Sequence, residues 1–398
     1  MVGDCHGIFH GAGGRGSAGP VNRVLIFRNE VLPRSETFIL AQAMALRKFE
    51  PWFAGTHAAL HSMELPLEPV LVSSLASLAG KVRRRLFWRA GFAPGFYRRL
   101  QKIDPELVHA HFALDGAAAL PVSKHLKRPL VVTLHGYDVT SSDKGLRRSQ
   151  EGRLYLRQRA ELWQRTAVFL CVSEFIREKA LEKGFPAAKL AVHYTGIDLA
   201  LFRPDEVERD RNLIVFTARL VEKKGARYLL DALAKVRERW PAVHLAMIGA
   251  GPLDAELRAR VECERLPCEF LGVQGAEVVK EYLAKARVFC VPSVTAANGD
   301  SEGLGMVFAE ALAMGTPVAS FRHGGIPEVV SDGETGLLAP EADGGALAEN
   351  ILRLLADDAL WERLSANGVR AMREKFDLQK QTARLEEIYA DVVCGRMR

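Results

Sequence analysis

Short apolar runs and longer amphipathic segments alternate along most of the chain. The runs at 21–27, 107–112, 130–134, 213–217 and 288–291 have the length and composition of buried strands. Strands that alternate with helices predict parallel sheets covered by helices on both faces, which is an α/β fold. The segments between the runs predict helices at 35–48, 114–125, 147–165, 174–183, 226–239, 253–265, 276–286, 303–314, 346–356, 358–375 and 378–393.

One polar stretch interrupts this alternation. Residues 199–212 contain Pro204 and show no period, which predicts a linker. The linker separates an N-terminal domain at 21–198 from a C-terminal domain at 213–375, both of them Rossmann-like. Because ligands of such sheets bind at the carboxyl ends of the strands, we expect the site in the cleft between the domains.

Composition limits the class of protein. The 398 residues suffice for two domains, and 48% hydrophobic with 26% charged residues is typical of a globular protein. No apolar run approaches the ~20 residues of a membrane-spanning helix. The six cysteines lack CxxC spacing, which fits a reducing cytoplasm. Residues 1–20 contain many glycines and lack the apolar core of a signal peptide, so we expect a disordered leader there.

The net charge of +6 is unevenly distributed. Residues 69–103 contain no Asp or Glu and interleave basic with aromatic side chains. Such a segment suits an anionic membrane surface, which we expect 81–102 to contact. A solvated basic face is the alternative, and nucleic acid is disfavoured because no binding motif accompanies the segment. The basic residues are Lys81, Arg83, Arg84, Arg85, Arg89, Arg98, Arg99 and Lys102.

Two carboxylates stand out after the strand at 288–291. Glu302 precedes the helix expected at 303–314, whose first free backbone N–H groups favour an anionic group. Glu310 would lie ~12 Å further along, in a helix otherwise too apolar for the surface. A helix cap and a carboxylate paired with a distant Arg are the plainer alternative. The residues that would supply the free N–H groups are Gly303, Leu304 and Gly305.

Two cations follow the first strand of the second domain. Arg219 and Lys224 lie in a strand-to-helix turn, where folds of this kind usually bind phosphate. The planar fork of an Arg and the point charge of a Lys suit a diphosphate, although cations are also common on any surface. Gly251 and Val273 occupy two further loops that follow strands of the same domain.

Three histidines end or follow strands of the first domain. His135 comes directly after the strand at 130–134 and should project toward the cleft, although a structural role is commoner for such a histidine. His109 and His111 share one face of a strand because side chains alternate there. This spacing could hold a metal ion, but no third ligand is evident, so no metal site is predicted.

Several of these elements resemble those of glycosyltransferase family 4. Glu302, seven residues and Glu310 resemble its E-x7-E element, and the AMGTPVAS and GGIPEVV that follow are similar to the family pattern. TARLVEKKG resembles its diphosphate clamp, MIGAGPL a turn of its donor domain, and THGYDV its THG-x-D stretch. The resemblance covers 21–393 and implies the GT-B fold, two Rossmann-like domains facing across a central cleft. A C-terminal helix at 376–398 is expected to pack back on the first domain.

The resemblance implies a retaining transfer of a hexosyl group from a UDP- or GDP-linked sugar, without a metal or another cofactor. Arg219 and Lys224 would neutralise the departing diphosphate, Glu302 would accept hydrogen bonds from donor-sugar hydroxyls, and His135 would lie beside the anomeric centre. Glu310 would accept hydrogen bonds from the ribose. The other donor-site residues implied are Gly251, Val273, Gly303, Leu304 and Gly305, and the acceptor side comprises His109, His111, Ser35, Glu36 and Asp138.

The loop after the first strand departs from the family pattern. Many members carry Gly-Gly there, whereas this chain reads RNEVLPRSETF. Its SETF resembles a subset of bacterial exopolysaccharide and colanic-acid-type glycosyltransferases. That subset implies a glycan or polyprenyl-linked acceptor, and an enzyme in the cytoplasm or on the inner face of the membrane.

Three other functions remain as alternatives. Gly299, Ser301 and Gly303 satisfy the G-x-S-x-G of a serine hydrolase, but about eight residues separate the serine from the preceding strand, whereas such an elbow follows its strand directly. A nucleotide-sugar epimerase would share the fold, and a nucleotide-sugar sensor would need neither Glu302 nor His135. A G-x-G-x-x-G at 11–16 lacks the flanking strand and helix of a dinucleotide site.

Overall fold

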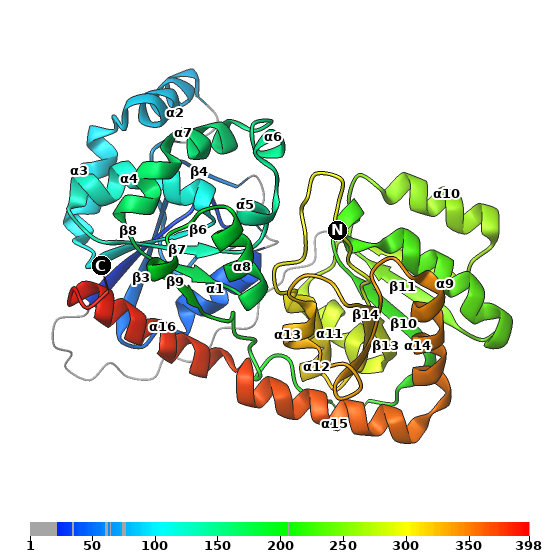
Figure 1. Ribbon diagram of the computed structural model, residues 1–398. Helices are drawn as coiled ribbons and strands as arrows, with labels where there is room; N and C mark the ends of the chain where they lie inside the picture. The colour runs from blue at the N-terminus through cyan, green and yellow to red at the C-terminus, as the bar shows by residue number, and fades with distance from the viewer. Residues whose placement is uncertain are drawn as a thin grey trace, which may run out of the picture.

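The computed structural model describes residues 22–33, 36–59, 63, 65–73, 77–205 and 207–397. These residues form two α/β domains that lie side by side (Figure 1). The leader expected at 1–20 and the helix cap expected at Ser35 lie outside the described residues. No helix in the described ranges is long and apolar enough to cross a bilayer.

The first domain is built on a parallel sheet of seven strands in the order β5-β3-β1-β6-β7-β8-β9. Its central strands are completely buried, as their continuous apolar runs require of a sheet covered on both faces. The strands are β1 (Asn22–Phe27), β3 (Phe49–Gly55), β5 (Val70–Leu71), β6 (Leu107–His111), β7 (Leu130–Leu134), β8 (Thr166–Cys171) and β9 (Leu190–Val192). A separate short pair, β2 (Glu30–Val31) and β4 (His57–Ala58), joins the loops that follow β1 and β3.

Two apolar cores lie on opposite faces of this sheet. Leu25 and Phe27 of β1 face one core, while Val24 and Ile26 face the other, because side chains alternate along a strand. Helices α3, α4 and α7 cover the first core, and α1 and α16 cover the second. The helices of this domain are α1 (Thr37–Met44), α2 (Leu78–Ala90), α3 (Pro94–Ile103), α4 (Ala113–Leu126), α5 (Tyr137–Thr140), α6 (Asp143–Leu146), α7 (Gln150–Arg165) and α8 (Glu174–Glu182).

The second domain holds a parallel sheet of six strands in the order β12-β11-β10-β13-β14-β15. The strands are β10 (Asp210–Thr217), β11 (His244–Ile248), β12 (Cys268–Gly272), β13 (Ala286–Cys290), β14 (Val318–Phe321) and β15 (Gly336–Ala339). The helices are α9 (Ala226–Arg239), α10 (Asp254–Glu264), α11 (Ala276–Lys285), α12 (Met306–Ala313), α13 (Ile326–Val329), α14 (Gly344–Ala356) and α15 (Asp358–Lys375). β10 begins at Asp210 rather than at 213, because Asp210 still pairs with Ala286 of β13.

Two segments of chain connect the domains and run alongside each other. The Ile197 N–H donates to the Phe376 carbonyl at 2.7 Å, and the Leu378 N–H donates to the Ile197 carbonyl at 3.0 Å. Beyond this point α16 (Leu378–Val393) leaves the second domain and packs on the first (Figure 1). The Glu386 carboxylate of α16 accepts the Arg47 N–H at 2.7 Å and holds the start of β3. The two-domain α/β architecture with a returning C-terminal helix is therefore confirmed.

Candidate active site

Lys224 and Glu302, two of the predicted donor-side residues, meet at the loop between β13 and α12. Lys224 lies in the turn after β10, and its Nζ pairs with the Glu302 carboxylate. Ser293 donates its hydroxyl to the same carboxylate at 3.2 Å. Lys223 pairs with Asp300 at 3.0 Å. These contacts hold the loop against the carboxyl end of β10, where phosphate is usually bound in such sheets.

Glu302 is a buried and ionised carboxylate, with 7% of its surface exposed. Burial alone would raise its pKa, but Lys224 and Lys223 lower the pKa of Glu302 to about 2. The carboxylate therefore keeps its charge at neutral pH and can accept hydrogen bonds from the hydroxyls of a sugar.

The helix expected from residue 303 begins at Met306 instead. Residues 302–305 form a loop, and Gly305 has a φ of +83°, a left-handed conformation that favours glycine over a residue with a Cβ. The expected separation of Glu302 and Glu310 by two helical turns is therefore wrong, because half of the interval is not helical.

The loop before α12 nevertheless offers free donors. The backbone N–H groups of Gly303, Leu304 and Gly305 donate to no other described residue. They precede the first turn of α12, where the helix dipole adds partial positive charge. Arg219 is exposed in the turn that carries Lys224. Amides and cations together suit an anion with several oxygens, such as a diphosphate.

Glu310 lies on α12 among buried apolar residues, with Ala309 and Ala311 on either side of it. No described residue donates a hydrogen bond to its carboxylate, and burial raises the pKa of Glu310 to about 7. A half-buried carboxylate without a partner is costly in a folded protein. Its unused acceptor capacity fits the role that the resemblance implies, binding the hydroxyls of a ribose.

Gly251 and Val273 lie at the carboxyl edge of the second sheet. A Cβ on Gly251 would come within 2.4 Å of the Leu220 carbonyl oxygen, so glycine lets the loops after β10 and β11 pack closely. Val273 follows β12 and is 74% exposed. The structure therefore gives Gly251 a packing role and leaves Val273 open at this edge.

The two domains meet at Gly303 and His135. A Cβ on Gly303 would lie 2.0 Å from the His135 carbonyl oxygen, so only glycine allows this approach. Ser173 of the first domain also donates its hydroxyl to the Gly303 carbonyl at 2.6 Å. The donor-side loop thus lies directly against the strand end that carries His135, and the two halves of the predicted site come together.

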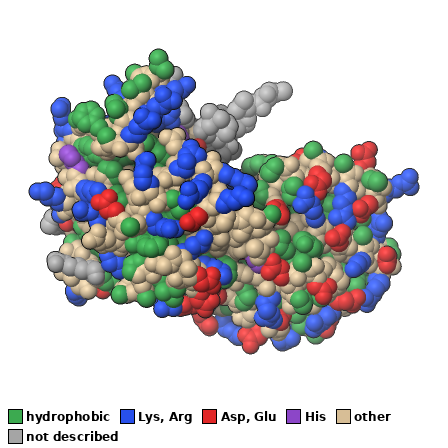
Figure 2. Space-filling view, turned by 45° about the horizontal axis from the view of Figure 1, so that its top comes forward, with side chains coloured by type: hydrophobic (Ala, Val, Ile, Leu, Met, Phe, Trp, Pro, Cys, Tyr) green, Lys and Arg blue, Asp and Glu red, His purple; other side chains and the backbone are tan. Residues whose placement is uncertain are grey.

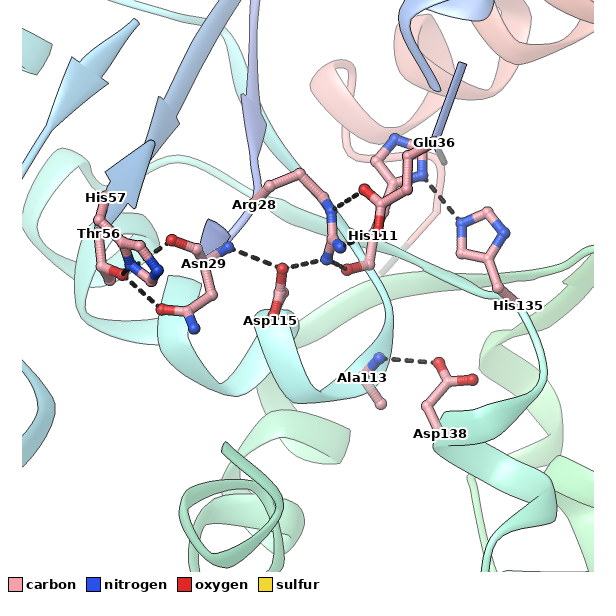
Figure 3. A network of polar contacts seen from close by, with 10 residues as sticks. All are labelled: Arg28, Asn29, Glu36, Thr56, His57, His111, Ala113, Asp115, His135 and Asp138. Atoms are coloured by element: carbon pink, nitrogen blue, oxygen red, sulfur yellow. Dashed lines mark hydrogen bonds and ion pairs between the residues drawn. The ribbon is translucent and has the colours of Figure 1, made fainter. Parts of the chain in front are cut away.

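His135 is surrounded by rings. Its Nε2 lies 3.0 Å from Nδ1 of His111 (Figure 3), and its ring centroid lies 4.5 Å from that of Phe112. Burial lowers the pKa of His135 well below its ordinary value, and Arg28 lowers it further. His135 is therefore a neutral imidazole, which can exchange hydrogen bonds with a sugar or a phosphate without carrying charge.

His109 does not line the acceptor side, contrary to expectation. Its Nδ1 lies 2.6 Å from the Tyr389 hydroxyl and its Nε2 lies 2.7 Å from the Thr133 hydroxyl, so both nitrogens serve the core. His111 is also buried, and it contacts His135 from behind. Within the described ranges no three His, Cys, Asp or Glu side chains could hold a metal ion.

Arg28 organises the loop that departs from the family pattern (Figure 3). Its Nε and Nη2 donate to the two oxygens of Glu36 at 2.8 and 2.5 Å. Its Nη1 donates to the His111 carbonyl at 3.1 Å and binds the Asp115 carboxylate. The guanidinium also lies 4.6 Å from the ring centroid of Phe112, a cation–π contact. Arg28 thereby joins the ends of β1 and β6 to the start of α1.

Sequence reasoning missed Arg28, Phe112 and Asp115. The available signal was position, because Arg28 directly follows a buried strand and Phe112 directly follows another. Phe112 has a φ of +69° and a ψ of 141°, a region that residues with a Cβ rarely occupy. Backbone strain of this kind clusters at functional sites, and here it points the ring toward His135.

Asp138 and Glu36 do not face an acceptor freely. Asp138 accepts the Ala113 and Gly136 N–H groups, each at 2.9 Å, and is 2% exposed. Its expected acceptor contact is therefore wrong, because both oxygens tie the turns after β6 and β7 together (Figure 3). Glu36 precedes α1, and the pair with Arg28 occupies both of its oxygens.

The rival hydrolase site is not formed. The Ser301 hydroxyl donates to the Gly299 carbonyl at 3.2 Å and forms no hydrogen bond with a described histidine. His323, which follows it in the sequence, instead accepts the Glu302 N–H through Nε2 at 3.3 Å. Without a base at the hydroxyl, Ser301 lacks the activation that a nucleophilic serine needs.

Comparisons with known proteins identify the family of this chain. Residues 37–201 match the family described as Glycosyltransferase Family 4, and residues 211–357 match Glycosyl transferases group 1. The chain is 31% identical over 349 residues to a GDP-mannose-dependent alpha-(1-6)-phosphatidylinositol monomannoside mannosyltransferase of Mycolicibacterium smegmatis, covering 84% of each protein. This chain belongs to glycosyltransferase family 4.

Two other relatives are named for the biosynthesis of colanic acid and of amylovoran. The chain is 33% identical to the putative colanic acid biosynthesis glycosyltransferase WcaL of Escherichia coli, over 67% of this chain and 65% of WcaL. It is 32% identical to the amylovoran biosynthesis glycosyltransferase AmsK of Erwinia amylovora, over 63% of this chain and 61% of AmsK. The matched regions thus span somewhat less than two thirds of these relatives.

Solved structures show that the fold is shared. Anabaena HepE, solved with UDP and glucose, aligns with a TM-score of 0.73 at 19% identity over 93% of this chain and 100% of its own. The sucrose-phosphate synthase of Thermosynechococcus elongatus aligns with a TM-score of 0.72 at 22% identity over 94% of this chain and 100% of its own.

Proposed function

We propose that this member of family 4 transfers a sugar, with retention of configuration, from a UDP- or GDP-linked donor to a glycan or lipid-linked acceptor in surface-polysaccharide or glycolipid synthesis. One observation carries the proposal. The free N–H groups of 303–305 lie beside the Lys224–Glu302 pair and against the strand end of His135. An anion, a sugar and a neutral imidazole can therefore meet in one place.

The chemistry follows from these groups. The bond between the anomeric carbon and the diphosphate oxygen breaks, and the acceptor oxygen bonds to the same face of that carbon. The acceptor proton passes to the departing diphosphate. Lys224, Arg219 and the free amides stabilise the negative charge that develops on the diphosphate, which is the main demand of such a reaction. We propose that these groups make a metal ion unnecessary.

Two carboxylates bind different parts of the donor. Glu302 accepts hydrogen bonds from the hydroxyls of the donor sugar, and Glu310 accepts them from the ribose. Glu302 is already ionised, whereas the pKa of Glu310 near 7 means that binding of hydroxyl donors must favour its charged form. His135 lies beside the anomeric carbon, with His111 and Phe112 fixing its ring.

The donor base and the acceptor are proposed from relatives. HepE was solved with UDP and with UDP-glucose, while the mycobacterial relative is GDP-mannose-dependent, so both nucleotides are candidates. The acceptor of that mycobacterial enzyme is a phosphatidylinositol monomannoside, and the colanic acid and amylovoran relatives are named for polysaccharides. We therefore propose that the enzyme works in the cytoplasm at the inner membrane surface on a lipid-linked glycan.

A thermal-shift panel tests the donor site. UDP, GDP, ADP and their sugar conjugates are each added to the wild type and to the Glu310→Ala variant. We expect one base to raise the melting temperature of the wild type, because a ligand that binds only the native state stabilises it by mass action. At 100 times its Kd the gain is about 2.7 kcal/mol.

The same panel can overturn the proposal. Glu334→Ala is the control, because this carboxylate is exposed in the turn before β15, where Asn367 of α15 donates to the Glu334 carbonyl. The shift should persist in Glu334→Ala and shrink in Glu310→Ala. If no nucleotide shifts the melting temperature, the proposed donor site is wrong. Release of free sugar without an acceptor would instead favour an epimerase.

A further inference from the structure

Helix α2 presents a row of aliphatic side chains to solvent. Leu78, Val82 and Leu86 are 79%, 49% and 44% exposed, and their spacing of four residues places them on one face of the helix. Phe92, just beyond the helix, is 60% exposed. We name these four side chains the apolar stripe. They cluster within fifteen residues of sequence, whereas single exposed apolar residues need no explanation.

The opposite face of α2 fixes the orientation of the stripe. Phe87 is 2% exposed, and its ring centroid lies 5.8 Å from that of Phe96 on α3. The helix ends at Gly91, whose carbonyl accepts the Tyr97 hydroxyl at 2.6 Å. Because α2 is anchored on both sides of its last turn, the stripe is held outward by packing of the core rather than exposed by fraying.

The cations around the stripe lack partners. Lys81, Arg83, Arg85 and Arg89 on α2 are exposed, and no described carboxylate lies within ion-pair distance of them. α10 shows the contrast, since its Arg258 and Arg260 pair with carboxylates one turn away. Figure 2 shows Lys and Arg side chains beside hydrophobic ones over this end of the first domain. Arg98, Arg99 and Lys102 of the neighbouring helix α3 are also exposed, and Arg99 donates to the Leu71 carbonyl.

A pocket of about 460 Å³ lies between the last turn of α2 and α4. Trp88 and Tyr97 contribute apolar walls, and Arg89 and Lys124 contribute charge. α2 packs with the core on the face of the sheet opposite to α16, so the C-terminal helix does not cover this surface (Figure 1).

We propose that α2, the loop at 91–93 and α3 form a docking surface for an anionic lipid bilayer. An amphipathic helix with aliphatic residues flanked by cations is suited to lie in the headgroup region, where both kinds of side chain are satisfied. A second copy of the chain would bring like charges together, and nucleic acid would leave the aliphatic side chains in water. The docking surface lies outside the cleft, so it stands or falls independently of the reaction proposed above.

Vesicle sedimentation of the full chain tests this surface. The vesicles contain phosphatidylcholine alone or with about 30% phosphatidylglycerol, an anionic lipid. We expect the wild type to bind only the anionic vesicles, and to be released as salt approaches ~1 M, where the Debye length falls to ~3 Å. Arg83→Gln/Arg85→Gln/Arg89→Gln should weaken binding by on the order of 100-fold, since each cation near an anionic surface contributes about fivefold.

Two further variants make the test decisive. Leu78→Ser/Val82→Ser/Leu86→Ser should also weaken binding, because it removes aliphatic contact without changing charge. Arg363→Gln/Arg370→Gln/Arg373→Gln, on exposed positions of α15, makes the same charge change elsewhere and should bind as the wild type does. The proposal would be overturned by an equal loss of binding in this control or by unchanged binding in either α2 variant. It would also be overturned if nuclease treatment abolished binding, or if the stripe variant only dissociated a dimer. The nucleotide thermal shift should remain in all three variants, which separates failure of docking from failure of the donor site.

Discussion

At the scale of single residues, the cleft uses similar carboxylates in opposite electrostatic states. Glu302 and Glu310 are both drawn out of water, yet the pKa falls to about 2 in one and rises to about 7 in the other. The difference is the partner, because Lys224 and Lys223 face Glu302 and no described cation faces Glu310. Ionising Glu310 therefore costs free energy in the folded protein, and hydrogen bonds from a hydroxyl-bearing ligand can lower that cost.

Replacing Glu310 should reveal this penalty as a dependence of stability on pH. The folded-state pKa of Glu310 is raised above its unfolded value, so stability is fullest below pH ~4.5 and falls as pH rises through about 7. We expect Glu310→Gln to raise the free energy of unfolding at pH 8 by about 1–3 kcal/mol, while weakening nucleotide binding. Urea unfolding at pH 5 and pH 8 measures the difference.

Glu334→Gln provides the matched comparison, because it removes an exposed carboxylate and should change neither value. An equal gain in stability for Glu310→Gln at both pH values would show that the gain does not come from the ionisation of this group.

At the scale of elements, a carboxylate of the second domain binds backbone N–H groups at the start of a helix of the first domain, where a helix has no partners of its own. The N-terminus of α8 is capped from the other domain, since the Glu328 carboxylate accepts the Glu174 N–H at 2.8 Å and the Phe175 N–H at 2.9 Å. Tyr194 donates its hydroxyl to the same carboxylate at 3.0 Å. A charge at a helix N-terminus is favourable, so this contact ties the relative position of the domains to a local cap.

Glu328→Gln should therefore loosen the contact between the domains. A neutral amide accepts through one oxygen only and loses the interaction with the helix dipole, which is worth about 0.3–1 kcal/mol near a surface. We expect a raised KM for the donor with a smaller change in kcat, because domain closure precedes chemistry. Steady-state kinetics with the donor found in the thermal-shift panel measures this, and small-angle scattering should show a larger radius of gyration.

Two outcomes would contradict this account of Glu328. One is an unchanged KM together with an unchanged radius. The other is a loss of kcat alone, which would place Glu328 in the chemical step.

At the scale of the whole molecule, the returning helix α16 makes the first domain depend on the end of the chain. Tyr389 is 1% exposed, its ring centroid lies 5.2 Å from that of Phe49, and its hydroxyl lies 2.6 Å from His109. Through His109 the contact reaches the ring of His111, 4.3 Å away, and then His135. The returning helix thus supports the ring of His135 through two intervening histidines.

Two substitutions at Tyr389 separate packing from hydrogen bonding. Tyr389→Ala should lower the free energy of unfolding by about 3–5 kcal/mol, because it removes a large buried ring. Tyr389→Phe should lower it by only about 1–3 kcal/mol, because it leaves His109 without one partner. Thermal unfolding of the apo protein measures both. No loss in Tyr389→Phe would show that the hydroxyl makes no separate contribution, and equal losses in the two variants would show that packing of the ring makes none.

The amino-acid sequence by itself determined the two-domain architecture, whereas the donor site that it predicts stays a prediction. Alternating apolar runs and amphipathic segments report burial directly, so the two sheets and most helices could be predicted. The placement of Lys224 and Glu302 in loops after strands was also predictable, because the carboxyl ends of parallel strands share one edge. The start of α12 could not be predicted from the sequence, because the residues at 303–305 are compatible with the first turn of a helix and with a loop before it.

Only the tertiary structure decided the first-domain side of the site. Arg28 is far along the chain from Phe112 and Asp115, and no local sequence pattern joins it to them. The contacts between the strand ends give these three residues their role. His109 and Asp138 looked like site residues by position, but the core and two backbone turns occupy their polar atoms. A local pattern records which side chains avoid water, whereas the partner that satisfies each polar group is chosen by packing between distant segments.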